Sequence, residues 1–168
     1  MSWYHYAAYG SNLHPFRLGK RIASAELLGT RVLTGHELRF NKAGFNDSSG
    51  KCNVNTGSNA VHLAIYRIKE SERATLDRVE GLGKGYDSLT IRLEGFGGCS
   101  IYVADAIAIN DGLQPMDWYK EMVLLGCRLH GFPNDYVRAI ENIEPITDPD
   151  ENRAHEQWQI VEELRSAS

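Results

Sequence analysis

The sequence has 168 residues, of which 42% are hydrophobic and 24% are charged, and its formal net charge is −4. This length and composition predict one domain over residues 1–168 with a buried core, and they exclude a disordered or fibrous chain. The mildly acidic balance, without a run of lysine and arginine, argues against nucleic acid and anionic membranes as partners.

The sequence has neither a membrane-spanning segment nor a secretory signal, and both bear on where in the cell the protein is expected. No apolar run approaches the roughly 20 residues of a membrane-spanning helix, and residues 1–5 do not have the pattern of a secretory signal. Cys52, Cys99 and Cys127 have no CxxC spacing, which indicates reduced thiols. We therefore expect a cytoplasmic protein, and its composition permits a monomer or a homodimer.

The first half of the chain predicts mainly strands. An aromatic strand ends at a cluster of turn-forming residues, and proline suits the first position of the short helix that follows. The expected elements are a strand over Trp3 to Tyr9, a helical turn over His14 to Ile22, one or two strands over Ala25 to Phe40 broken near Gly35, a long loop over Phe45 to Asn59, and a strand over Ala60 to Ile68.

The second half passes from strands to helices. A Gly95–Gly98 turn predicts a hairpin, and the apolar spacing of Trp118, Met122, Leu125 and Leu129 predicts a helical stripe. The expected elements are a helix over Ser71 to Glu80 that Gly81 ends, strands over Leu89 to Leu93 and Ile101 to Ile109, a helix from Pro115, a short helix from Asn134 to Ile143, and a charged helical tail over 150–168.

This order does not alternate strand and helix regularly, which argues against a doubly wound parallel sheet. It predicts the α+β class, with a mostly antiparallel curved sheet or small barrel.

The first candidate site is the turn Tyr9-Gly10-Ser11-Asn12 at the end of the first strand. Glycine permits backbone angles that point successive N–H groups in one direction, so such a turn can bind a carboxylate or an oxyanion. Ser11 and Asn12 add side-chain donors at the same place. The alternative is an ordinary strand-ending turn, which has the same composition.

The second candidate is Glu80. Leu76, Val79 and Glu80 share one face of the predicted helix, so Glu80 is drawn toward the core with its two apolar neighbours. Burial and the negative end of the helix dipole both disfavour a charged carboxylate there, which suits a general acid–base group. The alternative is a solvated glutamate at a frayed helix end.

The other patterns give weak signals. The glycines of Gly81 to Tyr86 do not have the spacing of a nucleotide-binding loop, and they follow a helix instead of preceding one. His155 begins an HExxH-like segment without its second histidine, and no histidine pair has metal-ligand spacing. Ser11 is not in a G-x-S-x-G elbow. We therefore expect no metal and no cofactor.

Five segments, in order, resemble the γ-glutamylcyclotransferase family. Tyr6-Ala7-Ala8-Tyr9-Gly10-Ser11-Asn12-Leu13 is similar to its [YF]-x-A-Y-G-S-N-[LM] signature, and Leu76 to Gly81, with Tyr86 beyond, to its L-D-x-x-E-G…Y segment. The others are Cys99 to Tyr102, Pro115 to Tyr119 and Gly126 to Tyr136. The chain departs from the family pattern at Met116, Cys127 and Phe132.

The resemblance implies a small mixed, mostly antiparallel β-barrel with flanking helices and a small-molecule γ-glutamyl substrate. The substrate α-amine would attack the γ-glutamyl carbonyl, releasing 5-oxoproline and an amine or amino acid. Glu80 would be the general acid–base. The substrate-binding residues would be Tyr6, Ala7, Ala8, Tyr9, Gly10, Ser11 and Asn12, together with the pocket tyrosines Tyr86, Tyr102 and Tyr119.

Two alternatives to this enzyme remain open at the level of sequence. One is a non-catalytic protein of the same fold that binds a small carboxylate or γ-glutamyl compound. The other is an amidase with Ser11 as nucleophile. The sequence does not identify the leaving group, whose site we expect on the segment from Phe45 to Asn59.

Overall fold

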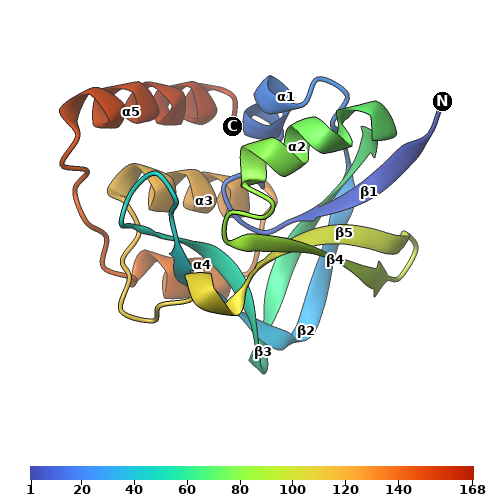
Figure 1. The fold of residues 1–168 in the computed structure, drawn as a ribbon, viewed down its shortest axis with the longest axis horizontal. Coiled ribbons are helices and arrows are strands. Elements are labelled where there is room, and N and C mark those ends of the chain that lie inside the picture. The colour runs from blue at the N-terminus through green and yellow to red at the C-terminus, as the bar shows by residue number, and fades with distance from the viewer.

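The computed structural model describes the whole chain, from Met1 to Ser168. A five-stranded sheet lies at its centre, with the strand order β2-β3-β1-β5-β4 (Figure 1). The central strand β1 runs parallel to β5, and all other neighbours are antiparallel. The strands are β1 (Trp3–Ala8), β2 (Glu26–Ala43), β3 (Gly50–Lys69), β4 (Tyr86–Leu93) and β5 (Gly97–Ala104).

The longest part of the sheet is the hairpin of β2 and β3, and the expected loop over Phe45 to Asn59 is wrong for most of its length. Only residues 44–49 connect the strands, because the glycine- and asparagine-rich start of β3 pairs with the end of β2 from Ala43↔Gly50 onward. Pairing with a neighbouring strand overrides the weak strand propensity of these residues.

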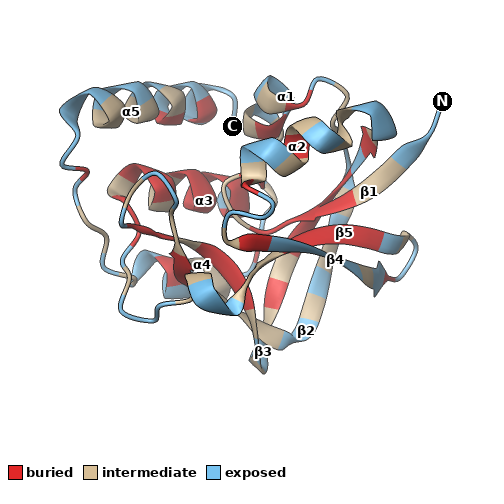
Figure 2. Ribbon diagram, in the orientation of Figure 1, coloured by how far each residue is buried: buried red, intermediate tan, exposed pale blue.

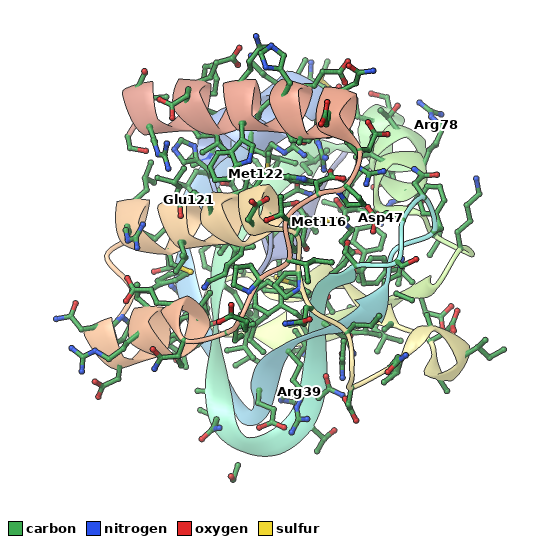
Figure 3. The ribbon with its side chains drawn as sticks, turned by 90° about the vertical axis from the view of Figure 1, so that its left-hand side faces the viewer. Arg39, Asp47, Arg78, Met116, Glu121 and Met122 are labelled. Atoms are coloured by element: carbon green, nitrogen blue, oxygen red, sulfur yellow. The ribbon has the colours of Figure 1, made fainter.

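The expected break near Gly35 is a bend within one strand. The pairing of β2 with β3 continues on both sides of a register shift between Thr34 and His36, and Gly35 has a φ of 72°. Figure 3 shows both strands turning together at the bottom of the view, near Arg39. A bulge of this kind increases the local twist, so the hairpin curls the sheet.

Five α-helices flank the sheet. In Figure 1, α1 and α2 lie above it, and α3, α4 and α5 lie on its left-hand side. Their bounds are α1 (Pro15–Arg21), α2 (Arg73–Glu80), α3 (Asp117–Leu129), α4 (Asn134–Glu141) and α5 (Glu151–Ser166), and two 3-10 turns are η1 (Glu70–Glu72) and η2 (Ala106–Ala108). None of the helices is both long and apolar enough to cross a membrane.

Two helix and strand ends differ from the sequence-based expectation. The helix expected from Ser71 begins as the 3-10 turn η1 and becomes α-helical at Arg73. The strand expected to reach Ile109 ends at Ala104, because the Asp105 side chain accepts hydrogen bonds from the N–H groups of Ile107 and Ala108 and closes a turn there. Asparagine and aspartate compete with strand pairing in this way.

The core lies between the inner face of the sheet and α3. Figure 2 shows burial concentrated in β1, β5 and α3, whereas α5 is largely exposed. Trp118, Met122 and Leu125 of the expected stripe are buried, but Leu129 at the end of α3 is 36% exposed. The sheet is open at β2 and β4, so the α+β prediction is confirmed as a curled half-barrel with flanking helices.

Candidate functional site

The turn after β1 lies against β3 and α3. A Cβ atom at Gly10 would be 3.0 Å from Cys52 Cβ and 3.5 Å from the Tyr119 hydroxyl. Gly10 does not have a positive φ, so the expected reason for this glycine is wrong. A side chain at this position would crowd Cys52, which would have to move by a few tenths of an ångström to admit it.

The same turn presents free backbone donors. Its one internal backbone hydrogen bond runs from the Leu13 N–H to the Gly10 carbonyl, at 3.1 Å. The N–H groups of Gly10, Ser11 and Asn12 donate to no acceptor within the protein. Unpaired N–H groups near a cavity are donors for an anionic ligand, because leaving them buried and unpaired is costly.

Glu80 is the last residue of α2. Gly81 ends the helix in the left-handed conformation, with a φ of 79°, and its N–H bonds to the carbonyls of Asp77 and Arg78. Of the two apolar residues expected to draw Glu80 inward, Leu76 is fully buried but Val79 is 37% exposed. The Glu80 side chain is only 17% exposed, so it is held inside the protein surface.

Three polar side chains meet at the Glu80 carboxylate. Asn12 Nδ2 donates to Glu80 Oε1 at 2.5 Å and to the Tyr6 hydroxyl at 3.2 Å. Arg21 Nη1 donates to Asn12 Oδ1 at 3.1 Å and lies 3.6 Å from Glu80 Oε1. Donors and a nearby cation stabilise an ionised carboxylate, so these contacts oppose the effect of burial that the sequence led us to expect.

Two tyrosine hydroxyls at the site accept hydrogen bonds. Tyr6 accepts from Asn12, and Tyr119 accepts from the Cys52 N–H at 3.0 Å. Burial raises the pKa of both phenols well above the ordinary value, so both stay protonated at neutral pH.

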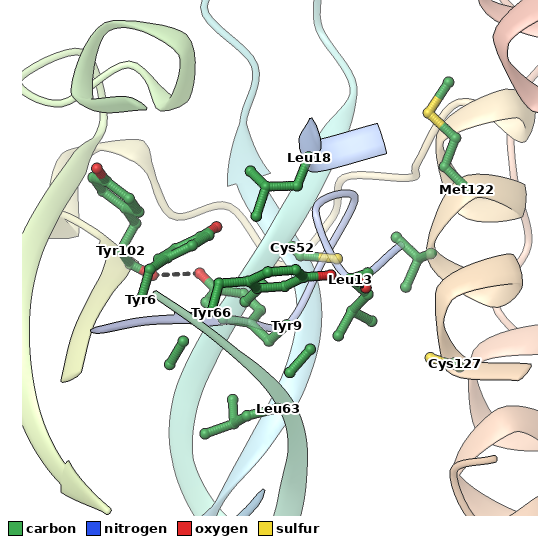
Figure 4. Packing of buried hydrophobic residues seen from close by; sticks show 14 of the residues in the cluster. Tyr6, Tyr9, Leu13, Leu18, Cys52, Leu63, Tyr66, Tyr102, Met122 and Cys127 are labelled. Atoms are coloured by element: carbon green, nitrogen blue, oxygen red, sulfur yellow. Dashed lines mark hydrogen bonds between the residues drawn. The ribbon is translucent and has the colours of Figure 1, made fainter. Parts of the chain in front are cut away.

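Three other tyrosines donate to the protein itself. Tyr9 donates to the Tyr102 carbonyl at 2.5 Å, as Figure 4 shows, and Tyr86 donates to the Cys52 carbonyl at 2.5 Å. Tyr102 donates to Asp77 Oδ1 at 2.6 Å. These hydroxyls stabilise the walls of the site and do not donate to a ligand, because each already donates its proton to an acceptor in the protein.

A small inner cavity of about 30 Å³ brings most of these residues together. Eight of the ten residues given a substrate-binding role by the resemblance line it, together with Glu80 and Cys52. Its lining residues are Tyr6, Tyr9, Gly10, Ser11, Asn12, Cys52, Glu80, Tyr86, Tyr102 and Tyr119. Ala7 and Ala8 are fully buried in β1 and line neither this cavity nor the next.

An outer cavity of about 260 Å³ adjoins the inner one, and both are lined by Ser11, Glu80, Tyr86 and Tyr119. At the start of the segment from Phe45 to Asn59, residues 45–47 line the outer cavity, and the binding of the leaving group there stays a prediction. The other lining residues are Arg17, Arg21, Lys42, Gly44, Lys51, Val79, Trp118, Arg153 and Gln157.

The arrangement suits acid–base chemistry on a ligand with an anionic end. The Glu80 carboxylate lines a cavity that is also lined by residues with unpaired backbone N–H groups and by the hydroxyls of Tyr6 and Tyr119. No histidine lines either cavity, and Ser11 makes no side-chain hydrogen bond, so Ser11 has no adjacent base. No cluster of three or more His, Cys, Asp or Glu side chains is arranged to hold a metal ion.

Curated proteins and solved structures resemble the chain, although no model of a protein family matches it. The γ-glutamylcyclotransferases of Bos taurus, Mus musculus and Homo sapiens are each 26% identical over 147 residues, covering 83% of this chain and 78% of the relative. A solved γ-glutamyl cyclotransferase superposes with a TM-score of 0.79 at 20% identity, covering 96% of this chain and 99% of that one.

A second solved structure, an uncharacterized protein from Homo sapiens, has a TM-score of 0.76 at 22% identity, with the same two coverages of 96% and 99%. Sequence and fold thus agree over nearly the whole chain. The chain therefore has the γ-glutamyl cyclotransferase fold and is similar in sequence to the curated γ-glutamylcyclotransferases.

Within this γ-glutamylcyclotransferase fold, several residues at the cavities had not been identified from the sequence. Cys52 lines the inner cavity, and burial raises the pKa of its thiol to about 12, so it is a neutral wall group. Arg21 reaches Glu80 from α1, and Lys42 and Lys51 flank the β2–β3 connection. Their spacing in the sequence does not indicate a common site, because only the folding of the chain brings them to the cavities beside Glu80.

Proposed function

We propose that this protein is a γ-glutamyl cyclotransferase that releases 5-oxoproline and an amine or amino acid, and that residues 1–168 form one domain with this activity. The observation that carries the proposal is the contact between Asn12 and Glu80 at 2.5 Å, because it joins the family's two signature segments at one cavity. The names of the curated relatives support the same activity.

Substrate binding would use the turn after β1. The unpaired N–H groups of Gly10 and Ser11 would bind the α-carboxylate of the γ-glutamyl group. The Tyr119 hydroxyl, which lines the same cavity, would donate its proton to the substrate. Fixing both ends of the glutamyl chain brings the α-amine near the γ-carbonyl, which accounts for much of the rate of a ring closure.

Proton transfer would be the task of Glu80. The substrate α-amine is mostly protonated at pH 7 and needs a base before it can attack. The ionised carboxylate takes one proton from the α-ammonium, and the free amine attacks the γ-carbonyl to form the new C–N bond of the five-membered ring. The attacking nitrogen then loses its second proton as the bond to the leaving nitrogen breaks. Through Glu80 both protons pass to the leaving nitrogen, which departs as an ammonium, and Glu80 is again ionised.

Asn12 and Arg21 would position this carboxylate. Both contact the same oxygen, Oε1, so Oε2 is left for the substrate. Asn12 is 2% exposed and also bonds Tyr6 and Arg21, so it has little freedom to move.

The direct test is to incubate the purified protein with several γ-glutamyl dipeptides and γ-glutamyl amines and to quantify 5-oxoproline. We expect Glu80→Gln to lower kcat by roughly 10²–10⁴-fold, the usual size of a general acid–base contribution. Glu94→Gln removes a carboxylate that lines neither cavity and serves as the matched control. A folded Glu80→Gln protein with full activity would remove Glu80 from the mechanism.

The alternative of a non-catalytic γ-glutamyl-binding protein gives a different result in the same experiment. Such a protein would bind γ-glutamyl dipeptides in calorimetry and release no 5-oxoproline. The amidase alternative has lost its support, because Ser11 has no hydrogen-bonded base.

A further inference from the structure

The outer cavity carries far more positive than negative charge. Five cationic side chains line it, Arg17, Arg21, Lys42, Lys51 and Arg153, against the two acids Asp47 and Glu80. The whole chain, by contrast, has a net charge of −4. A cavity whose charge opposes that of the rest of the protein attracts anions.

Three of the five cations have partners in the protein. Lys51 lies 3.3 Å from Asp47 Oδ2, and Arg153 lies 2.5 Å from Asp148 Oδ1. Arg21 bonds Asn12 and lies near Glu80. These three charges are largely neutralised before any ligand enters.

Lys42 has no such partner. It is 2% exposed, makes no hydrogen bond or ion pair, and has its ammonium 4.5 Å from the centre of the Tyr86 ring. Gly85, which has a φ of 108°, makes room for the Lys42 side chain, because a Cβ atom at Gly85 would lie 2.8 Å from Lys42 Cε. Burial and the nearby Lys51 lower the pKa of Lys42. The Lys42 side chain thus presents to the outer cavity an ammonium that has no ion-pair partner, which favours a ligand that supplies a negative charge.

Arg17 is the second unpaired cation. It makes no ion pair, and its Nε is buried without an acceptor. Burial lowers the pKa of its guanidinium to about 9, which still leaves the group charged at neutral pH. The cavity therefore contains two cations, Lys42 and Arg17, that the protein itself does not neutralise.

We propose that Lys42 and Arg17 form an anion-binding subsite for the leaving group, and that the preferred substrates are γ-glutamyl compounds whose leaving group carries two negative charges. An acidic amino acid, with its α-carboxylate and side-chain carboxylate, has this chemistry. The inference rests on the proposed cyclotransferase activity. The outer cavity lies beside Glu80, where the leaving nitrogen receives its proton, so the rest of the leaving group extends into it.

The test compares three substrates that differ in charge on the leaving side. These are γ-glutamyl-glutamate, the nearly isosteric γ-glutamyl-glutamine with one charge fewer, and γ-glutamyl-methylamide with none. We expect kcat/KM for the glutamate compound to exceed that for the glutamine compound by roughly ten-fold, the usual effect of one charge-assisted hydrogen bond. Added salt should reduce this preference. Equal kcat/KM for the two dipeptides would overturn the proposal.

Variants of Lys42 and Arg17 test whether these two residues cause the preference for the glutamate compound. Lys42→Met and Arg17→Met should each reduce the glutamate-to-glutamine ratio of kcat/KM by roughly five-fold or more, mainly through KM. Lys69→Met, which removes a lysine outside both cavities, should leave the ratio unchanged. If Lys42→Met instead lowers kcat/KM for all three compounds equally, Lys42 binds the glutamyl half and the proposal is wrong.

Two further measurements do not depend on turnover. Calorimetry with the Glu80→Gln protein should give tighter binding of γ-glutamyl-glutamate than of γ-glutamyl-glutamine, even if the wild type releases no 5-oxoproline. That combination would refute the cyclotransferase activity and retain the anion subsite. Lys42→Met should also raise Tm without ligand, because it removes a positive charge that has no ion pair and lies among other cations; a lower Tm would contradict the assignment of Lys42 as an unneutralised cation.

Discussion

Asn12 and Glu80 lie 68 positions apart in the chain, and the Asn12 amide donates to the Glu80 carboxylate at 2.5 Å. Asn12 follows the central strand of the sheet, whereas Glu80 ends a helix that lies above the sheet. Their contact fixes the carboxylate against the turn that offers free N–H groups. Each of the variants at the cavity therefore has an expected effect that can be read from these contacts.

Asn12→Ala should lower kcat/KM by roughly 10–100-fold, the effect of losing a hydrogen bond to a charged group. Asn12→Asp should be more damaging than Asn12→Ala, because it puts a second carboxylate beside Glu80. Steady-state kinetics on one γ-glutamyl dipeptide rank the two variants. The opposite ranking would mean that Asn12 does not act through Glu80.

Tyr119→Phe should raise KM by roughly ten-fold and lower the free energy of unfolding by about 1–3 kcal/mol, because the buried Cys52 N–H loses its acceptor. Tyr4→Phe is the matched control, since the Tyr4 hydroxyl is buried without a partner and lines neither cavity. Urea denaturation and Michaelis kinetics measure the two effects. Equal stability losses in both variants would contradict this role of the Tyr119 hydroxyl.

Gly10→Ala should destabilise the protein by about 1–3 kcal/mol and reduce activity, because its Cβ would press on Cys52 and the Tyr119 hydroxyl. Gly19→Ala, within α1, has no atom within 4 Å of the added Cβ. That control should stabilise the protein by about 0.5–1 kcal/mol, as alanine does in a helix. Thermal melting of both variants provides the comparison, and similar Tm changes would refute the close approach at Gly10.

Asp148→Asn should destabilise the protein at neutral pH but not in acid. Hydrogen bonds from Arg153, then from the Trp118 indole and the Asp150 N–H, lower the pKa of Asp148 to about 2 despite its burial. Because the folded-state pKa lies below the ordinary value, the carboxylate stabilises the fold above that value. The contribution is lost as the pH falls toward 2.

We expect Asp148→Asn to cost about 1–2 kcal/mol at pH 7, allowing for solvent screening of Arg153. Urea denaturation between pH 7 and pH 2.5 should show the difference from wild type shrinking as the pH falls. Asp87→Asn, at an exposed position without an ion pair, is the control. A difference that stays constant with pH would assign the effect to packing instead of charge.

Local patterns identified most of the fold and part of the site. Pro15 begins a helix, Gly81 ends one, and the Gly95–Gly98 turn joins two strands, because each of these signals depends on the backbone preferences of a few adjacent residues. The segment over 50–59 could not be assigned in this way. Its strand exists because β2 pairs with it, and pairing partners are not encoded locally.

For the candidate site too, local sequence patterns identified some of the residues, and only the fold brought the others together. The sequence by itself determined that a Gly-Ser-Asn turn follows the first strand and that Glu80 ends a short helix, since both facts are local and both lie in motifs that resemble a known family. Only the tertiary structure decided that Asn12 and Arg21 meet at the Glu80 carboxylate, and that Lys42 and Arg17 remain without a counter-ion. Charge pairing and burial depend on distances through space, which the order of residues along the chain does not contain.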